Sequence, residues 1–337
     1  MNTIEKEYGA QTPQTEIPVV SRRGFIGRGV LLAATGLTAG QGAAAPPAAR
    51  EPVASRAGAD SFSFVHITDT HIQPEKGAVA GVKKAFAAIA ALSPKPDFAL
   101  IGGDIVHAAS NANRDRATLL YELWREAVAG LEIPVHYSVG NGDVFSTIGA
   151  EHLAPMHPDY GKSGWMRRLG LGQRFHHFDH GGWRFVVLDS VRIDPSAETG
   201  YVGEIDPEQM KWLDGIMRGT EKAQPVVILT HIPLMTLFGL YTGGTTTALP
   251  PNLIVQNGRE VVEMFRGRNV RAVFQGHTHV VENCEYLGTR YITGGAVCGG
   301  WWQGPRFGTH PEGFGVVHVT GGQMNYRYVP YGWTPRP

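Results

Sequence analysis

The chain has 337 residues, enough for one large α/β domain or two smaller ones, and 42% of them are hydrophobic, which allows a sizeable core. Its 30 lysine and arginine residues balance its 30 aspartate and glutamate residues, so the formal net charge is zero. This balance excludes a broad basic surface for nucleic acid and a polybasic membrane patch, and it favours a small or mid-sized substrate. Because only two cysteines occur, Cys284 and Cys298, a zinc site of four cysteines is excluded. We expect both thiols to be buried rather than joined in a disulfide.

Residues 1–59 form a segment that we expect to lie outside the folded domain, which would span residues 60–337. The run Ser21-Arg22-Arg23-Gly24-Phe25-Ile26 precedes a Gly- and Ala-rich apolar stretch at 29–40 that is too short to span a membrane. This pattern resembles a bacterial twin-arginine export signal. The resemblance implies export of the folded protein by the twin-arginine translocase, a periplasmic or secreted location and no stable membrane anchor. The sequence is compatible with cleavage of the signal after residues 43–45 and with cleavage after residues 57–59.

From residue 62 onward the hydrophobic pattern alternates between strands and helices, with long loops at 144–173 and 239–252. The early βαβαβ order indicates a mostly parallel sheet, and the late run of short strands indicates an antiparallel or mixed one. Two such sheets packed face to face, with helices on the outer faces, predict a single four-layer α/β/β/α sandwich. We expect helices at 78–92, 114–129, 207–217 and 259–265, and strands at 62–67, 98–101, 135–139, 175–179, 183–188, 226–229, 270–274, 280–286, 290–297, 314–320 and 324–330.

Side chains that suit metal ions follow five of the predicted strands. In open α/β sheets, ligands gather outside the carboxyl ends of the strands. Carboxylate oxygens and imidazole nitrogens are ligands for Fe, Mn, Zn or similar divalent ions. Glycines precede three of these residues, where we expect the backbone to turn sharply and aim a side chain. The pattern therefore predicts a metal site formed by Asp69, His71, Asp104, Asn141, His231, His277 and His279.

The ordered set Asp-x-His, Gly-Asp, Gly-Asn, His and Gly-His-x-His resembles the calcineurin-like metallophosphoesterase family over residues 62 to about 330. The resemblance implies a two-metal hydrolase that cleaves a phosphomonoester or small phosphodiester by attack of a hydroxide bridging two divalent ions, Fe, Mn or Zn. It also implies the ligands: Asp69, His71 and His279 for one ion, Asn141, His231 and His277 for the other, and Asp104 as the bridge.

One position departs from that family. The usual motif is Gly-Asn-His-Asp/Glu, and Gly142 stands where the family has the histidine that binds phosphate or protonates the leaving group. General acid catalysis is typically worth about 10²–10⁴-fold. Three interpretations stay open: another histidine replaces it (His107 first, then His152 or His157), the leaving group needs no acid, or turnover is slow. Asp143, which would orient the missing histidine, is expected to bind a neighbouring group or to cap the turn.

Trp301 and Trp302 are candidates for the wall of a substrate pocket, with core packing as the equal competitor. The main alternative to an enzyme is a catalytically weak or inactive binding or scaffold protein that keeps the fold, and Gly142 is the feature in its favour. Among enzymes, the sequence does not rank a cyclic-nucleotide phosphodiesterase against a nucleotidase, a phospholipid-related esterase or a general phosphatase.

Overall fold

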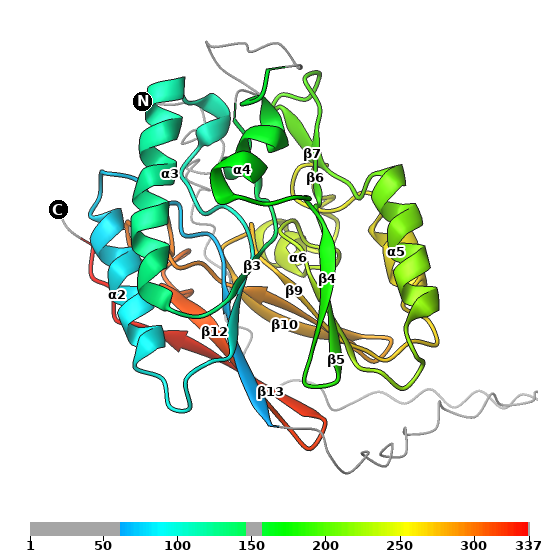
Figure 1. The fold of residues 1–337 in the computed structure, drawn as a ribbon. Coiled ribbons are helices and arrows are strands. Elements are labelled where there is room, and N and C mark those ends of the chain that lie inside the picture. The colour runs from blue at the N-terminus through cyan, green and yellow to red at the C-terminus, as the bar shows by residue number, and fades with distance from the viewer. Residues whose placement is uncertain (1–60, 146–156, 336–337) are drawn as a thin grey trace, which may run out of the picture. The chain divides into compact units, whose positions relative to one another are not determined.

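The structure is a computed structural model that describes residues 61–145 and 157–335. Within these residues a five-stranded and a six-stranded sheet face each other, and helices cover their outer sides (Figure 1). The first sheet has the order β13-β12-β1-β2-β3 and the second has the order β10-β11-β9-β8-β5-β4. The first contains β1 (Phe62–Ile67), β2 (Phe98–Ile101), β3 (Val135–Tyr137), β12 (Gly313–Thr320) and β13 (Gln323–Pro330). The second contains β4 (His176–His180), β5 (Trp183–Val187), β8 (Val226–Leu229), β9 (Val270–Gln275), β10 (Val281–Tyr286) and β11 (Thr289–Gly294).

Successive side chains of β1 point alternately toward the second sheet and toward the outer helices, which shows how the layers pack. Phe64 points toward the second sheet, where its ring centroid lies 5.4 Å from that of Phe185 and 5.6 Å from that of Phe274. Val65 and Ile67 point to the opposite side and pack in one cluster with residues of α2 (Ala78–Ala90) and α3 (Arg114–Val128). Because successive strand residues face opposite sides, a strand that is buried on both faces is apolar throughout.

The other described helices are α4 (Gly161–Leu169), α5 (Pro207–Gly219), α6 (Phe238–Gly243) and α7 (Gly258–Glu263). The predicted start of α5 is confirmed, because the Asp206 side chain accepts a hydrogen bond from the Gln209 amide and Pro207 occupies the first turn. No helix in the described ranges is both long and apolar enough to pass through a lipid bilayer. The predicted export signal at 1–59 lies outside the described residues.

The two mixed sheets and their outer helices confirm the predicted fold class, but the chain order within the sheets differs from the expectation. The last two strands, β12 and β13, return to the first sheet, where β12 pairs antiparallel with β1. The predicted loop at 239–252 contains most of α6, and a small hairpin of β6 (Val191–Ile193) and β7 (Tyr201–Gly203) was not predicted. Strand pairing across such long separations depends on tertiary contacts, which local periodicity does not encode. Cys284 and Cys298 are not joined in a disulfide, and Cys284 is only partly buried.

Candidate metal centre

The predicted metal ligands meet where the strands of both sheets end. The loop after β1 is tied to the loop after β2, since the amides of Asp69 and His71 donate to the carbonyls of Gly103 and Asp104. The end of β9 is tied to the end of β8 by a hydrogen bond from the Gly276 amide to the carbonyl of His231. All seven side chains lie in one cluster, in which Asn141 and His277 are partly exposed and the other five are buried.

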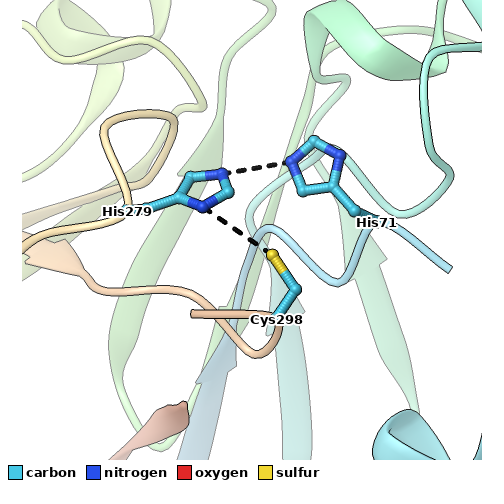
Figure 2. A group of neighbouring side chains, drawn as sticks. All are labelled: His71, His279 and Cys298. Carbon is cyan, nitrogen blue, oxygen red and sulfur yellow. Dashed lines mark hydrogen bonds between the residues drawn. The ribbon is translucent and has the colours of Figure 1, made fainter. Parts of the chain in front are cut away.

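One half of the cluster is formed by Asp69, His71 and His279. Nε2 of His279 lies 3.1 Å from Nε2 of His71 (Figure 2). The same nitrogen lies 3.4 Å from Oδ1 of Asp69. Nε2 of His71 also lies 3.4 Å from Oδ2 of Asp104. Two ring nitrogens and two carboxylates therefore point at a common point between them.

The other half is formed by Asn141, His231 and His277. Nε2 of His231 lies 3.1 Å from Oδ1 of Asn141 and 3.4 Å from Oδ1 of Asp104. His277 offers a ring nitrogen within 4.8 Å of the ligand atoms of His231 and Asp104. Asp104 thus directs one oxygen toward each half, which is the position that the resemblance implied for a bridge.

Backbone carbonyls determine which ring nitrogens remain available. Nδ1 of His231 lies 2.8 Å from the Gly102 carbonyl, and Nδ1 of His279 lies 2.6 Å from the Gly299 carbonyl. A carbonyl only accepts, so both Nδ1 atoms carry the proton and the neutral rings present lone pairs at Nε2. Nε2 of His231 faces two oxygen acceptors, so a positive charge, either a proton on Nε2 or a metal ion, is required between these atoms. The donor set therefore fits metal ions.

Burial and the charges of neighbouring ligands together set the pKa values of these groups. Burial lowers the pKa of His231, but the Asp104 carboxylate more than offsets this effect, and the pKa rises to about 9. Burial raises the pKa of Asp69, but the charge of His279 and its hydrogen bond lower it by more, to about 2. The carboxylates are therefore ionised at neutral pH, and the centre attracts positive charge.

Five of the candidate ligands have backbone angles that side-chain-bearing residues seldom adopt. Their φ angles are 54° at Asp69, 39° at His71, 51° at Asp104, 70° at His277 and 60° at His279. A non-glycine residue in this left-handed region costs on the order of 1–3 kcal/mol and is concentrated at functional sites. The surrounding loops hold this strain, and it aims the side chains inward.

Gly103, before Asp104, has a φ of 92° and confirms the predicted turn, but the glycines before Asn141 and His277 have a different role. Gly140 has an ordinary φ of −99°, but a Cβ there would lie 2.1 Å from the amide nitrogen of Asp104. A Cβ on Gly276 would lie 2.1 Å from Oγ1 of Thr68 and 2.5 Å from Oδ2 of Asp69. The prediction of a sharp glycine turn is wrong here, because these glycines permit close contact between loops while the ligands themselves bend.

Asp143 does not face the centre of the cluster. Its fully buried carboxylate accepts hydrogen bonds from the amides of Asp104 and Gly140 at 2.9 Å and from the amide of Val106 at 3.2 Å. It therefore positions the loop that carries Asp104, which agrees with the expectation that Asp143 binds a neighbouring group.

His107 lies next to the cluster, with its ring centroid 5.7 Å from that of His71. Burial, together with Lys76 and Arg116, lowers its pKa to about 4, so the ring is neutral at neutral pH. It can donate an N–H to a phosphoryl oxygen, but it is not an imidazolium acid. His157 contacts Arg114 and the Asp159 amide instead, and His152 lies outside the described residues.

Trp301 and Trp302 lie in different environments. Trp301 is partly exposed, and its ring centroid lies 4.6 Å from that of His279 and 6.4 Å from that of His71. Trp302 is 1% exposed, packs against Gly81 of α2 and donates its indole N–H to the carbonyl of His71 at 3.1 Å. Trp302 therefore belongs to the core, and its predicted place in a substrate wall is corrected.

Three groups at the centre escaped prediction. Cys298 places its Sγ 3.7 Å from Nδ1 of His279 (Figure 2), and the Gly299 carbonyl accepts from the same nitrogen. The Asn252 carbonyl lies 3.0 Å from Nε2 of His277. Carbonyls have no sequence signal, and a single cysteine distant from the motifs carries a weak one.

The sequence matches the family described as calcineurin-like phosphoesterase over residues 62–281. The chain belongs to this family. Relatives include the serine/threonine-protein phosphatase CPPED1 of Bos taurus, 27% identical over 73% of this chain and 71% of the relative. A probable cyclic nucleotide phosphodiesterase of Rhodococcus erythropolis is 23% identical over 80% of this chain and 83% of the relative. A crystal structure of a dimetal phosphatase from Danio rerio shares the fold, with a TM-score of 0.60, 16% identity and coverage of 80% of this chain and 96% of that one. The chain is a metal-dependent phosphoesterase.

Proposed function

We propose that the chain is a dimetal hydrolase that cleaves a phosphomonoester or a small phosphodiester. Asp69, His71 and His279 would hold one ion and Asn141, His231 and His277 the other, with Asp104 between them. The ions, Fe, Mn or Zn, would supply Lewis acidity toward the phosphoryl oxygens and lower the pKa of bound water.

The observation that carries this proposal is the acceptor-to-acceptor geometry around His231. Its Nε2 lies 3.1 Å from Oδ1 of Asn141 and 3.4 Å from Oδ1 of Asp104, while Nδ1 is committed to a carbonyl. These buried oxygens need a positive charge at Nε2, which a proton supplies in the metal-free protein and a metal ion would supply in its place.

The chain's own residues would orient the substrate. The Gly142 amide donates to Oδ1 of Asp104 at 2.6 Å and so holds this carboxylate in place. The neutral ring of His107, beside His71, would donate a hydrogen bond to a phosphoryl oxygen, and Trp301 would border the site on the side of His279.

The test is metal analysis combined with hydrolysis of p-nitrophenyl phosphate and its bis ester after loading with Mn, Fe or Zn. We expect bound metal and turnover in the wild type, and loss of both in His231→Asn. His180→Asn, a change at a partly exposed position on β4, is the matched control. Protein that binds no metal, or that is metal-loaded but inert on both esters, would contradict the proposal.

A second candidate, a catalytically weak or inactive scaffold with this fold, is favoured by Gly142. A Cβ there would lie 3.1 Å from Oδ1 of Asp104 and from the Val106 carbonyl, so a histidine requires shifts of a few tenths of an ångström. If the missing acid limits turnover, Gly142→His should raise the rate for alkyl esters more than for aryl esters. An unchanged ratio would show that another group already serves as the acid.

We also propose that residues 1–59 direct export through the twin-arginine translocase to the periplasm or beyond. The support is the Ser-Arg-Arg-x-Phe-Ile run at 21–26 and the apolar stretch behind it. Replacing Arg22 and Arg23 by lysine should retain the protein in the cytoplasm, as measured by cell fractionation. Unchanged export of that variant would rule the signal out.

A further inference from the structure

An uncharged segment borders the metal centre at two points. The sequence contains no Asp, Glu, Lys, Arg or His between His231 and Arg259. The segment leaves the centre at His231 and returns to it at Asn252, whose carbonyl contacts His277. The segment therefore places no ionisable side chain of its own next to the candidate ligands.

The same segment contributes exposed apolar side chains. Leu240 and Tyr241 of α6 are 51% and 56% exposed, and Phe307, which lies outside this segment in the loop between β11 and β12, is 44% exposed. The ring of Tyr241 lies 5.7 Å from that of Phe307. We call these three residues the aromatic rim. Exposed apolar groups that cluster beside a site commonly mark a ligand surface.

A chain of ring contacts joins the rim to the metal centre. The guanidinium carbon of Arg306 lies 4.1 Å from the Phe307 ring centroid and 4.7 Å from that of Trp301. The Trp301 ring in turn lies 4.6 Å from the ring of His279. The rim is therefore continuous with one wall of the site.

The chemistry of the centre points to the same kind of ligand. Gly142 lacks a side chain that could act as a general acid beside Asp104. Without protonation, the departing oxygen must be stable as an anion, and a phenol is a much stronger acid than an alkyl alcohol. The rim and the missing acid are independent observations, and both favour an aryl leaving group.

We propose that the aromatic rim is a leaving-group subsite and that the substrates are phosphate esters of aromatic alcohols with more than one ring. This inference rests on the proposed phosphoesterase function. In the reaction, oxygen from water bonds to phosphorus while the bond between phosphorus and the aryl oxygen breaks. The electron pair stays on the aryl oxide, which takes up a proton from solvent.

The test compares kcat/KM for 2-naphthyl, phenyl and methyl phosphate in the metal-loaded full chain. Naphthol and phenol have similar acidity, so the ratio of the first two rates reports ring contacts rather than leaving-group stability. Tyr241→Ala and Phe307→Ala should each lower the naphthyl-to-phenyl ratio about threefold to tenfold, the value of one aromatic contact. Leu119→Ala, which removes a 40% exposed side chain from α3, should leave the ratio unchanged.

A ratio that stays within twofold in both rim variants would overturn the subsite while the phosphoesterase function stands. Vesicle binding that both rim changes abolish, with unchanged ester ratios, would assign the rim to a lipid surface and also overturn the subsite. Wild-type protein that is inert on all three esters, and also on p-nitrophenyl phosphate and its bis ester, would overturn the proposed function itself, and the subsite with it.

Discussion

Asp104 is the side chain whose replacement tests the candidate metal centre most directly. Asp104→Asn keeps the shape of the side chain but removes its charge. Burial lowers the pKa of His231, and carboxylates led by Asp104 raise it from 6.5 to about 9. This net shift corresponds to about 3 kcal/mol of attraction for one positive charge. A divalent ion in the same place should lose at least as much, so we expect its affinity to fall by about a hundredfold or more.

The assay measures metal content after dialysis and kcat on p-nitrophenyl phosphate. Because Asp104 directs one oxygen at each half of the centre, the variant should retain fewer ions and lose at least about a hundredfold in kcat. Asp179→Asn, which removes a carboxylate from the surface pair with Arg184, should behave as the wild type. An Asp104→Asn protein with full metal content and near-normal turnover would refute the reasoning.

Three further predictions concern the loops around the centre. Trp302→Ala should lower the free energy of unfolding by about 3–5 kcal/mol in urea, and Trp301→Ala by clearly less; equal losses would contradict the core assignment. In metal-free protein, protonated His231 contributes its full stabilisation of the fold below pH 6.5. This stabilisation is lost as the pH rises through the raised pKa of about 9. Urea midpoints should therefore fall across this window, and a flat profile would count against the shift. Gly276→Ala, whose Cβ would lie 2.1 Å from a side-chain oxygen of the loop after β1, should lose metal and stability. The same change at Gly215 of α5, where a Cβ meets nothing within 4 Å, is its control.

Local sequence was sufficient for most secondary structure. The strand at Phe62–Ile67 and the helix that Asp206 and Pro207 begin occur where predicted, because apolar runs and capping residues act within a few neighbours. The return of β12 and β13 to the first sheet was not predictable in this way. The pairing of β12 with β1 joins residues more than two hundred positions apart, and its free energy comes from tertiary packing.

The residue types of the candidate centre follow from the sequence alone, because Asp, Asn and His at successive strand ends form a set that few other arrangements require. Tertiary structure decided how they act. It bends the ligand backbones to positive φ, uses Gly140 and Gly276 for close loop contact, and commits Nδ1 of His231 and His279 to carbonyls. It also separates Trp301, beside the centre, from Trp302, in the core. These outcomes depend on distances between segments far apart in the chain, and no single segment encodes them.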